Sequence, residues 1–415
     1  MNGAEYKKYN LVKNACFLTC ASTAITANLP PLLFLTFRES YGISYSLLGA
    51  LILINFGTQL LFDLVYSFFS DKFNLTASVR ATPAFMTAGL VLFSFSPWIF
   101  RGHEFIGLAL STVIFSAGGG LAEVLISPTV AAVPSREPDK LMSRLHSCYA
   151  WGVVALVLFT TGFNALFGRK MWQLLTLLLA GFPFASFIMM LRAGFPPLRP
   201  DVDWENGGRL PIKNALFYII CIFLGGASEC TMSQWCSTYL ESAVGVPKAV
   251  GDAVGVVLFG AALGLGRTLY AKHGRNINRV LFCGSAGAFF CYVTAVLTRS
   301  PAAGLAACAL TGFFVSMLWP GSLIAVSEKI PHGGVALYAL MAMGGDLGAS
   351  VCPQAVGFIT DKMLMSGNIS SLCDTLSLSP ETLAMKFGMA FAVPFPLILS
   401  VMTGYLLLKK KKNNV

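Results

Sequence analysis

Charge is scarce in this chain. Only 12% of its 415 residues are charged, about half the share expected of a soluble protein, whereas 55% are hydrophobic. The charges gather in short clusters between long apolar stretches instead of recurring along every segment. This distribution excludes an ordinary soluble domain and indicates a membrane protein.

Signatures of catalysis and metal binding are missing as well. The chain has no G-x-x-x-x-G-K-[ST] phosphate loop, no H-E-x-x-H and no G-x-S-x-G, and its four histidines are far apart. Its eleven cysteines form no C-x-x-C pair and are typical of small apolar packing residues. We therefore predict no enzymatic activity, no cofactor, no metal site and no transport driven by ATP hydrolysis.

Twelve apolar windows are each long enough to cross a hydrocarbon core of about 30 Å. They predict an all-α membrane protein with twelve transmembrane helices. The windows lie near residues 14–37, 46–69, 79–100, 104–133, 141–167, 171–192, 214–240, 249–271, 278–298, 301–327, 333–360 and 384–408.

A Pro- and Gly-rich stretch, "RAGFPPLRPDVDWENGGRLPIK", separates the first six windows from the last six. We predict an N-terminal six-helix bundle at 1–192, a linker at 193–213 and a C-terminal bundle at 214–415. The two halves also resemble each other: "SPTVAAVPSRE" closes the fourth window and "WPGSLIAVSEK" closes the tenth. In both segments a proline is followed by small and apolar residues and then by charge. Such a repeat is typical of secondary transporters. A non-transporting receptor or scaffold is the alternative.

The distribution of Lys and Arg predicts the orientation. With both termini in the cytoplasm, the inner segments hold 20 of the 29 basic residues and the outer segments hold 8. The net charge of +10 is therefore explained by topology, and we expect no nucleic-acid partner. The terminal run Lys409 to Lys412 is placed to contact anionic lipid headgroups.

Several motifs resemble the major facilitator superfamily. Asp71 and Lys72 in "YSFFSDKF" partly match its Gly-x-x-x-Asp-Arg/Lys loop pattern, with Ser67 in place of the glycine. The resemblance implies that Asp71 lies against the N-terminal end of the eleventh helix; a solvated loop carboxylate is the alternative. Within the superfamily, "GGGLAEVLISPTV", "MLWPGSLIAVSEK" and "GGDLGASVCPQAVGFITDK" are most similar to fucose-permease-like sugar transporters and their bacterial relatives.

Among the ionisable residues inside predicted spans, five stand out: Asp63, Glu123, Glu229, Arg267 and Asp346. A charged residue at a helix centre costs about 2.5–3.5 kcal/mol on insertion scales, so each is a functional candidate. Glu123 stands in a run with no other charge between Phe105 and Pro134. Low dielectric disfavours its charged form, which suits a group that takes up and releases a proton.

The family resemblance places the fourth, seventh and tenth helices, with the first, around a central cavity. It implies proton coupling and substrate binding for Glu123; a structural carboxylate is the alternative. The fucose permeases carry a second protonation site on the first helix, where this chain has Pro31. Glu229 on the seventh helix is our candidate to replace it, and Asp346 could be a third proton site or a structural hydrogen-bonding group.

Polar and aromatic residues near these acids make a plausible site for a sugar-like solute. Gln234 and Trp235 follow Glu229, although Trp235 could equally belong to an interfacial aromatic belt. Asn28 before Pro30-Pro31, and Trp319 before Pro320, mark helix breaks that would expose carbonyl groups; simple kinks are the alternative. Asp63 and Arg267 fit gating ion pairs better than a binding site.

We therefore predict a proton-coupled uptake carrier for a small polar, sugar-like solute, working by alternating access. Its expected partners are that solute, protons and membrane lipids, and we expect a monomer in a bacterial inner membrane. A proton-driven efflux antiporter for drugs or metabolites is the main rival interpretation.

Overall fold

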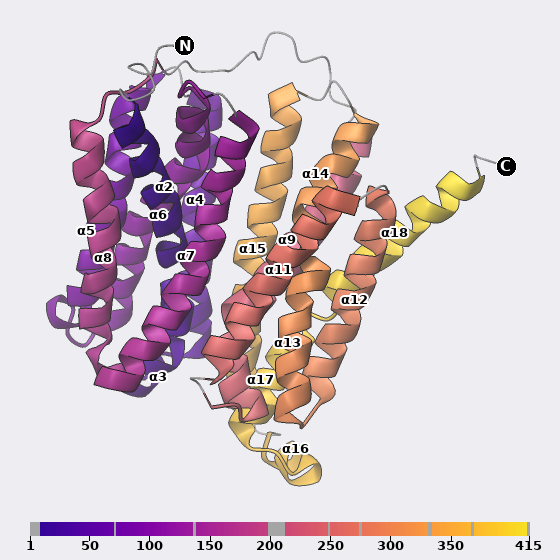
Figure 1. Cartoon of the computed structure of the whole chain (residues 1–415). Coiled ribbons are helices and arrows are strands. Elements are labelled where there is room, and N and C mark those ends of the chain that lie inside the picture. Colours follow the sequence, from indigo (N-terminus) through magenta and orange to yellow (C-terminus); the bar gives the residue numbers. More distant parts are fainter. Residues whose placement is uncertain are drawn as a thin grey trace. The chain divides into compact units, whose positions relative to one another are not determined.

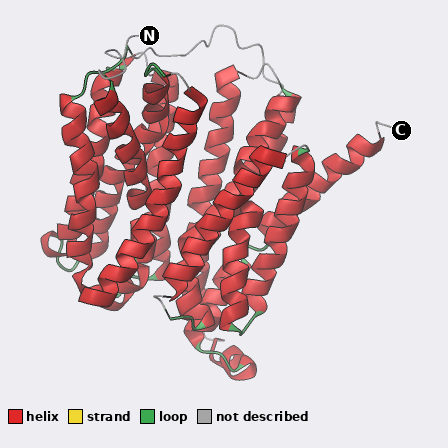
Figure 2. Ribbon diagram, viewed as in Figure 1, coloured by secondary structure: helices red, strands yellow, loops and turns green. Residues whose placement is uncertain are grey.

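The computed structural model describes residues 9–69, 72–135, 138–197, 212–247, 250–273, 276–330, 334–366 and 369–412. Within these ranges every regular element is a helix and no residue is in a strand (Figure 2). The predicted all-α membrane architecture is confirmed. Asp71 and most of the predicted linker lie outside the described residues.

The chain folds into two compact units. Unit 1 comprises residues 1–36 and 54–202, and unit 2 comprises residues 37–53 and 203–415. Unit 2 therefore takes in a short segment from early in the sequence, which carries the end of one helix and the start of the next.

Figure 1 draws the first helices in indigo to magenta and the later ones in red to yellow. The helices that begin before residue 200 are α2 (Asn10–Leu32), α3 (Phe34–Tyr41), α4 (Tyr45–Phe69), α5 (Leu75–Ile99), α6 (Glu104–Ala131), α7 (Pro138–Phe167), η2 (Arg169–Met171) and α8 (Trp172–Arg192). Those that follow are α9 (Ile212–Val244), η4 (Gly251–Val256), α11 (Val257–His273), α12 (Ile277–Leu297), α13 (Pro301–Val315), α14 (Leu318–Lys329), α15 (Gly334–Leu364), α16 (Ile369–Leu376), α17 (Pro380–Ala390) and α18 (Pro394–Lys412).

Each of the twelve apolar windows coincides with a helix or a helix pair. Among the described residues, nine segments are long and apolar enough to cross a membrane, and α2 with α3 makes a tenth span bent by 45°. The window near 249–271 falls on η4 and the shorter α11, and the window near 333–360 falls on α15. The bend follows Pro30 and Pro31, which remain inside α2.

Side-chain caps start several of these helices where the sequence supplies them. The Asn74 side chain accepts the Ala77 N–H at 3.0 Å and caps α5, and Asn276 does the same for α12. Ser300 caps α13, and Pro301 follows it at the first helical position. Proline suits this position because a backbone N–H there would have no acceptor within the helix.

Glycines let the helices of unit 1 approach closely. A Cβ atom added at Gly118 of α6 would lie 2.8 Å from the Thr82 carbonyl oxygen and 2.9 Å from the Met86 nitrogen of α5. On another side of α6, a Cβ atom at Gly120 would lie 3.0 Å from the Cα of Gln59 on α4. The Gly118–Gly120 run therefore lets α6 pack closely against both α5 and α4. This close packing sets the position of α6 just before Glu123.

Replacing Gly118 by alanine should destabilise unit 1, because the added methyl group meets backbone atoms that cannot move aside. The expected loss is about 1–3 kcal/mol, the usual range for overpacking. The melting temperature of the purified protein measures it, with Gly162→Ala on α7 as the matched control, since a Cβ there meets nothing within 4 Å. Equal melting temperatures for the two variants would contradict this packing.

Candidate functional site

An arginine joins three elements in the membrane-spanning part of unit 2. Nη2 of Arg267 on α11 donates to Oε1 of Glu229 on α9 at 3.2 Å, forming an ion pair. Its Nε donates to the carbonyl oxygen of Ser316 at 3.1 Å. The carboxylate is largely enclosed, with 17% of the Glu229 side chain exposed, whereas 45% of the Arg267 side chain is exposed.

The sequence explains why Ser316 has a carbonyl to offer. The helix of the tenth span ends with α13 at Val315 and begins again with α14 at Leu318. Pro320 stands in the first turn of α14, and proline has no N–H to donate to the residue four positions earlier, which is Ser316. The guanidinium of Arg267 therefore satisfies an acceptor that the Trp319-Pro320 break leaves open.

The second carboxylate oxygen of Glu229 has different surroundings from the first. Its Oε2 is buried and accepts no hydrogen bond from any residue in the described part of the chain. Glu229 and Asp346 of α15 both act electrostatically on the thiol of Cys230, so the two carboxylates lie in the same region of unit 2. Asp346 itself is buried, with 6% of its surface exposed.

Glycines bring α9, α14 and α15 together around this region. A Cβ atom at Gly226 of α9 would lie 2.6 Å from the Gly345 carbonyl oxygen and 2.9 Å from a ring carbon of Trp319. The indole of Trp319 thus rests on two glycines, one from each neighbouring helix. Trp319 is half-buried.

The other expected cavity residues of α9 lie deeper. Trp235 is fully buried, and its Nε1 donates to the Pro353 carbonyl oxygen at 2.9 Å. Its ring also packs against Tyr45, with centroids 6.1 Å apart. Gln234 is buried as well. This geometry gives Trp235 a packing contact within unit 2, and its part in binding a solute stays a prediction.

In unit 1 the expected proton site is exposed. The side chain of Glu123 is exposed, although Leu121, Ala122 and Leu125 around it on α6 are buried. One turn or more before it, uncharged polar groups join α6 to α4: Ser116 Oγ donates to Asn55 Oδ1 at 2.6 Å. The Gln59 side chain donates to the same oxygen at 2.8 Å.

The remaining predicted residues are spread over unit 1. Asn28 is half-buried on α2, where its Nδ2 donates to the Ala24 carbonyl at 3.0 Å and to the Tyr149 hydroxyl at 3.4 Å. Asp63 is half-buried on α4. Lys72 is exposed, with its Nζ 4.9 Å from the Phe69 ring centroid.

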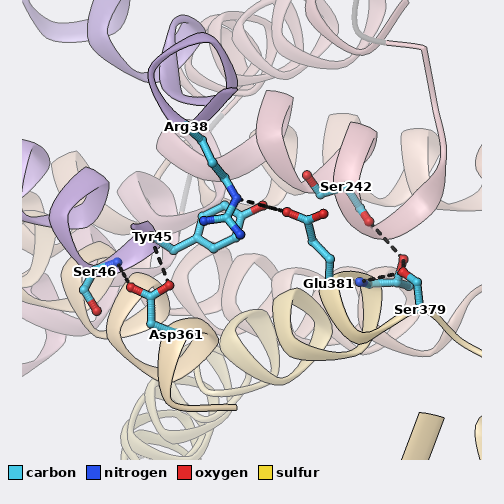
Figure 3. A network of polar contacts seen from close by, with 8 residues as sticks. Arg38, Tyr45, Ser46, Ser242, Asp361, Ser379 and Glu381 are labelled. Atoms are coloured by element: carbon cyan, nitrogen blue, oxygen red, sulfur yellow. Dashed lines mark hydrogen bonds and ion pairs between the residues drawn. The ribbon is translucent and has the colours of Figure 1, made fainter. Parts of the chain in front are cut away.

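A second polar network in unit 2 has no counterpart in our sequence analysis. The carboxylate of Asp361 on α15 accepts the backbone N–H groups of Tyr45 at 3.1 Å and Ser46 at 2.6 Å (Figure 3). These are the first N–H groups of α4, which have no acceptor within their own helix. A carboxylate at this position also complements the positive end of the helix dipole.

Glu381 extends this network, which we call the clasp and define as Arg38, Tyr45, Ser46, Asp361 and Glu381. The Glu381 carboxylate accepts the Tyr45 hydroxyl at 2.7 Å and Nε of Arg38 at 3.1 Å. The guanidinium of Arg38 also stacks over the Tyr45 ring, 4.1 Å from its centroid. Figure 3 shows Arg38 and Tyr45 both pointing toward Glu381.

Comparison with known proteins identifies the family. The sequence model of the Major Facilitator Superfamily matches residues 15–353. The chain belongs to the Major Facilitator Superfamily. As a member of this superfamily it is a multi-pass membrane transporter and not an enzyme.

Known proteins similar to this superfamily member cover most of its length. Membrane protein MosC of Rhizobium meliloti is 25% identical over 344 residues, which are 78% of this chain and 77% of MosC. A bacterial homologue of the human lysosomal transporter Spinster has a similar fold, with a TM-score of 0.73 at 13% identity over 97% of each chain. The fucose:proton symporter of E. coli gives a TM-score of 0.57 at 12% identity, over 95% of this chain and 99% of the symporter.

For this Major Facilitator Superfamily transporter, Arg267→Gln should lower the free energy of unfolding by about 1–3 kcal/mol, because it leaves the enclosed Glu229 carboxylate unpaired. The double variant Glu229→Gln/Arg267→Gln should recover most of that loss, and Arg192→Gln at the exposed end of α8 is the control. Thermal unfolding in detergent gives the values. Additive losses in the double variant would show that the pair contributes nothing.

Asp361→Asn keeps the shape of the side chain but removes its negative charge from the start of α4. We expect a loss of about 0.5–2 kcal/mol, the range measured for helix N-caps. Asp374→Asn on the exposed face of α16 is the matched control, measured by the same thermal unfolding. If both variants melt together, Asp361 has no capping role.

Proposed function

We propose that this transporter is a proton-coupled uptake carrier for a small polar, sugar-like solute, working by alternating access in a bacterial inner membrane with both termini in the cytoplasm. The observation that supports it most is the Glu229–Arg267 ion pair, which joins α9 to the shorter apolar helix α11 at 3.2 Å and leaves one carboxylate oxygen without a hydrogen-bond partner among the described residues. An ion pair of this kind is a switch that a single proton can open.

The chemistry of the switch follows from charge. While Glu229 is ionised, it neutralises Arg267 and holds α11 to α9. A proton on Oε2 removes the negative charge, so the ion pair becomes an ordinary hydrogen bond and Arg267 loses most of its electrostatic hold on α9. Arg267 stays bonded to the Ser316 carbonyl, so the side that is released is the contact with Glu229.

Glu123 is the proposed second proton site. A carboxylate exposed to lipid at this depth would be costly, whereas one exposed to water in a transport pathway would not. Its exposed side chain, between buried apolar neighbours on α6, supports the second arrangement. Asp346 is the third candidate, because it lies in the same region as Glu229.

The solute class rests on polar and aromatic residues of the helices that are predicted to line the cavity. Asn28 and Trp319 are half-buried and are the proposed contact groups, with an amide for hydroxyls and an indole for the apolar face of a ring. Gln234 and Trp235 are buried and are proposed to shape the cavity from α9. The fold shared with a fucose:proton symporter supports the same class of solute.

Glu123→Gln and Glu229→Gln should each abolish accumulation driven by a proton gradient while leaving solute exchange without a gradient measurable. The reason is that an amide fills the space of the acid but stays uncharged, so it cannot take up and release a proton during the transport cycle. Uptake and counterflow in proteoliposomes measure the two activities, with a panel of sugars as solutes. The matched control is Glu104→Gln, in the first turn of α6, far along the helix from Glu123.

Three results would reject this proposal. Accumulation that survives in both variants would remove the acids from proton coupling. Solute movement in the direction opposite to the proton flow would favour the efflux antiporter. The absence of pH-dependent flux with any solute would favour a receptor or scaffold.

A further inference from the structure

An apolar groove lies on unit 2, and neither the clasp residues nor Glu229 and Arg267 line it. It has a volume of about 350 Å³ and is lined by side chains of α11, α12 and the end of α13. Leu269, Cys283, Phe313, Phe314 and Met317 supply its apolar walls. Figure 1 shows the three helices that form it side by side.

The polar groups of the groove gather at one end. His273 is the last residue of α11, and Arg279 lies in the first turn of α12; both are exposed. Tyr270 lies one turn before His273. The basic end of the groove is therefore at helix termini, where a bilayer has its headgroups, and the predicted orientation places these termini at the cytoplasmic leaflet.

The apolar part extends from these termini into the depth of the hydrocarbon. From His273 to Gly266 is about 10 Å along α11, at 1.5 Å per residue. Leu265, Leu269 and Phe282 in the same helices expose 54%, 41% and 37% of their surfaces, as side chains facing lipid do. At this depth a hydrocarbon chain is a better occupant than a water-soluble molecule or a polar peptide.

We propose that the groove binds an anionic phospholipid of the cytoplasmic leaflet, with its phosphate at Arg279 and His273 and an acyl chain along α11 and α12. Arginine binds phosphate oxygens through two N–H groups at once, and the N-terminal end of α12 adds a positive partial charge. Glu328, which interacts electrostatically with Tyr270, limits the negative charge that this end accepts. A lipid with a single negative charge, such as phosphatidylglycerol, fits best.

The deep end of the groove gives the lipid a position next to the switch. Gly266 and Ser316 both line the groove, and Ser316 supplies the carbonyl that Arg267 binds. An acyl chain in the groove therefore packs against the break between α13 and α14. The lipid site itself does not depend on the proposed solute or on proton coupling.

The chain carries a natural reporter for this site. Of its eleven cysteines, all within the described residues, Cys283 alone is exposed, and it lines the groove. The rate at which N-ethylmaleimide alkylates Cys283, followed by peptide mass spectrometry on the purified full-length protein in a neutral detergent, therefore reports whether the groove is filled.

Phosphatidylglycerol at ten times its dissociation constant should slow alkylation of Cys283 roughly tenfold, since only the empty groove reacts. Phosphatidylcholine and inorganic phosphate at the same concentrations should have little effect. Arg279→Gln should remove the protection and Arg279→Lys should retain most of it. The matched control Lys329→Gln, at the exposed end of α14, should behave as the unmodified protein.

Four results would overturn the site. Equal protection by phosphatidylcholine, or full protection of Arg279→Gln, would show that the basic end selects nothing. Protection by inorganic phosphate alone would show an anion site without a lipid. Protection that rises with protein concentration in the absence of lipid would show that a second copy of the chain covers the groove.

Discussion

A charge inside hydrocarbon needs a partner, and the membrane-spanning part of unit 2 depends on how this need is met. Arg267 carries the charge into the span, and its two partners have different origins. Glu229 supplies the opposite charge. Ser316 supplies a carbonyl that is free because proline stands four residues later. The helix break, the buried acid and the arginine therefore form one arrangement, in which removing any member leaves another unsatisfied. Lys386 follows the same rule, since its ammonium group donates to the Val296 and Thr298 carbonyls at the end of α12.

Several hydrogen bonds between helices in the described part of unit 1 join uncharged groups. Hydroxyl and amide groups join its helices, as in the Ser116–Asn55 contact between α6 and α4 and the 2.7 Å contact between Thr19 and Ser186. The two proposed proton sites differ physically: Glu229 is enclosed and bound to a cation, whereas Glu123 is open to its surroundings.

Much of the fold is predictable because local chemistry determines it. The apolar windows and the Asn and Ser caps lie in continuous stretches of sequence, and the structure has helices at the windows. Hydrogen-bond partners on different helices could not be predicted in this way. The bond between Tyr45 and Asp361 joins residues 316 positions apart, and nothing in either neighbourhood indicates it. The same holds for Trp235, whose sequence fits a cavity wall or an interfacial belt. Its bond to the Pro353 carbonyl places it in the core of unit 2, but no pattern around position 235 points to residue 353.

The membership of residues 37–53 in unit 2 has a consequence for how the protein is made. This segment leaves the ribosome among the first residues, long before Asp361 and Glu381 exist to receive it. The start of α4 must therefore remain without its final acceptors through most of translation, and unit 2 becomes complete only when the last helices have been inserted. If the chain were cut at the central linker, residues 37–53 would stay with the N-terminal half, and the C-terminal half would lack the segment that Asp361 and Glu381 bind.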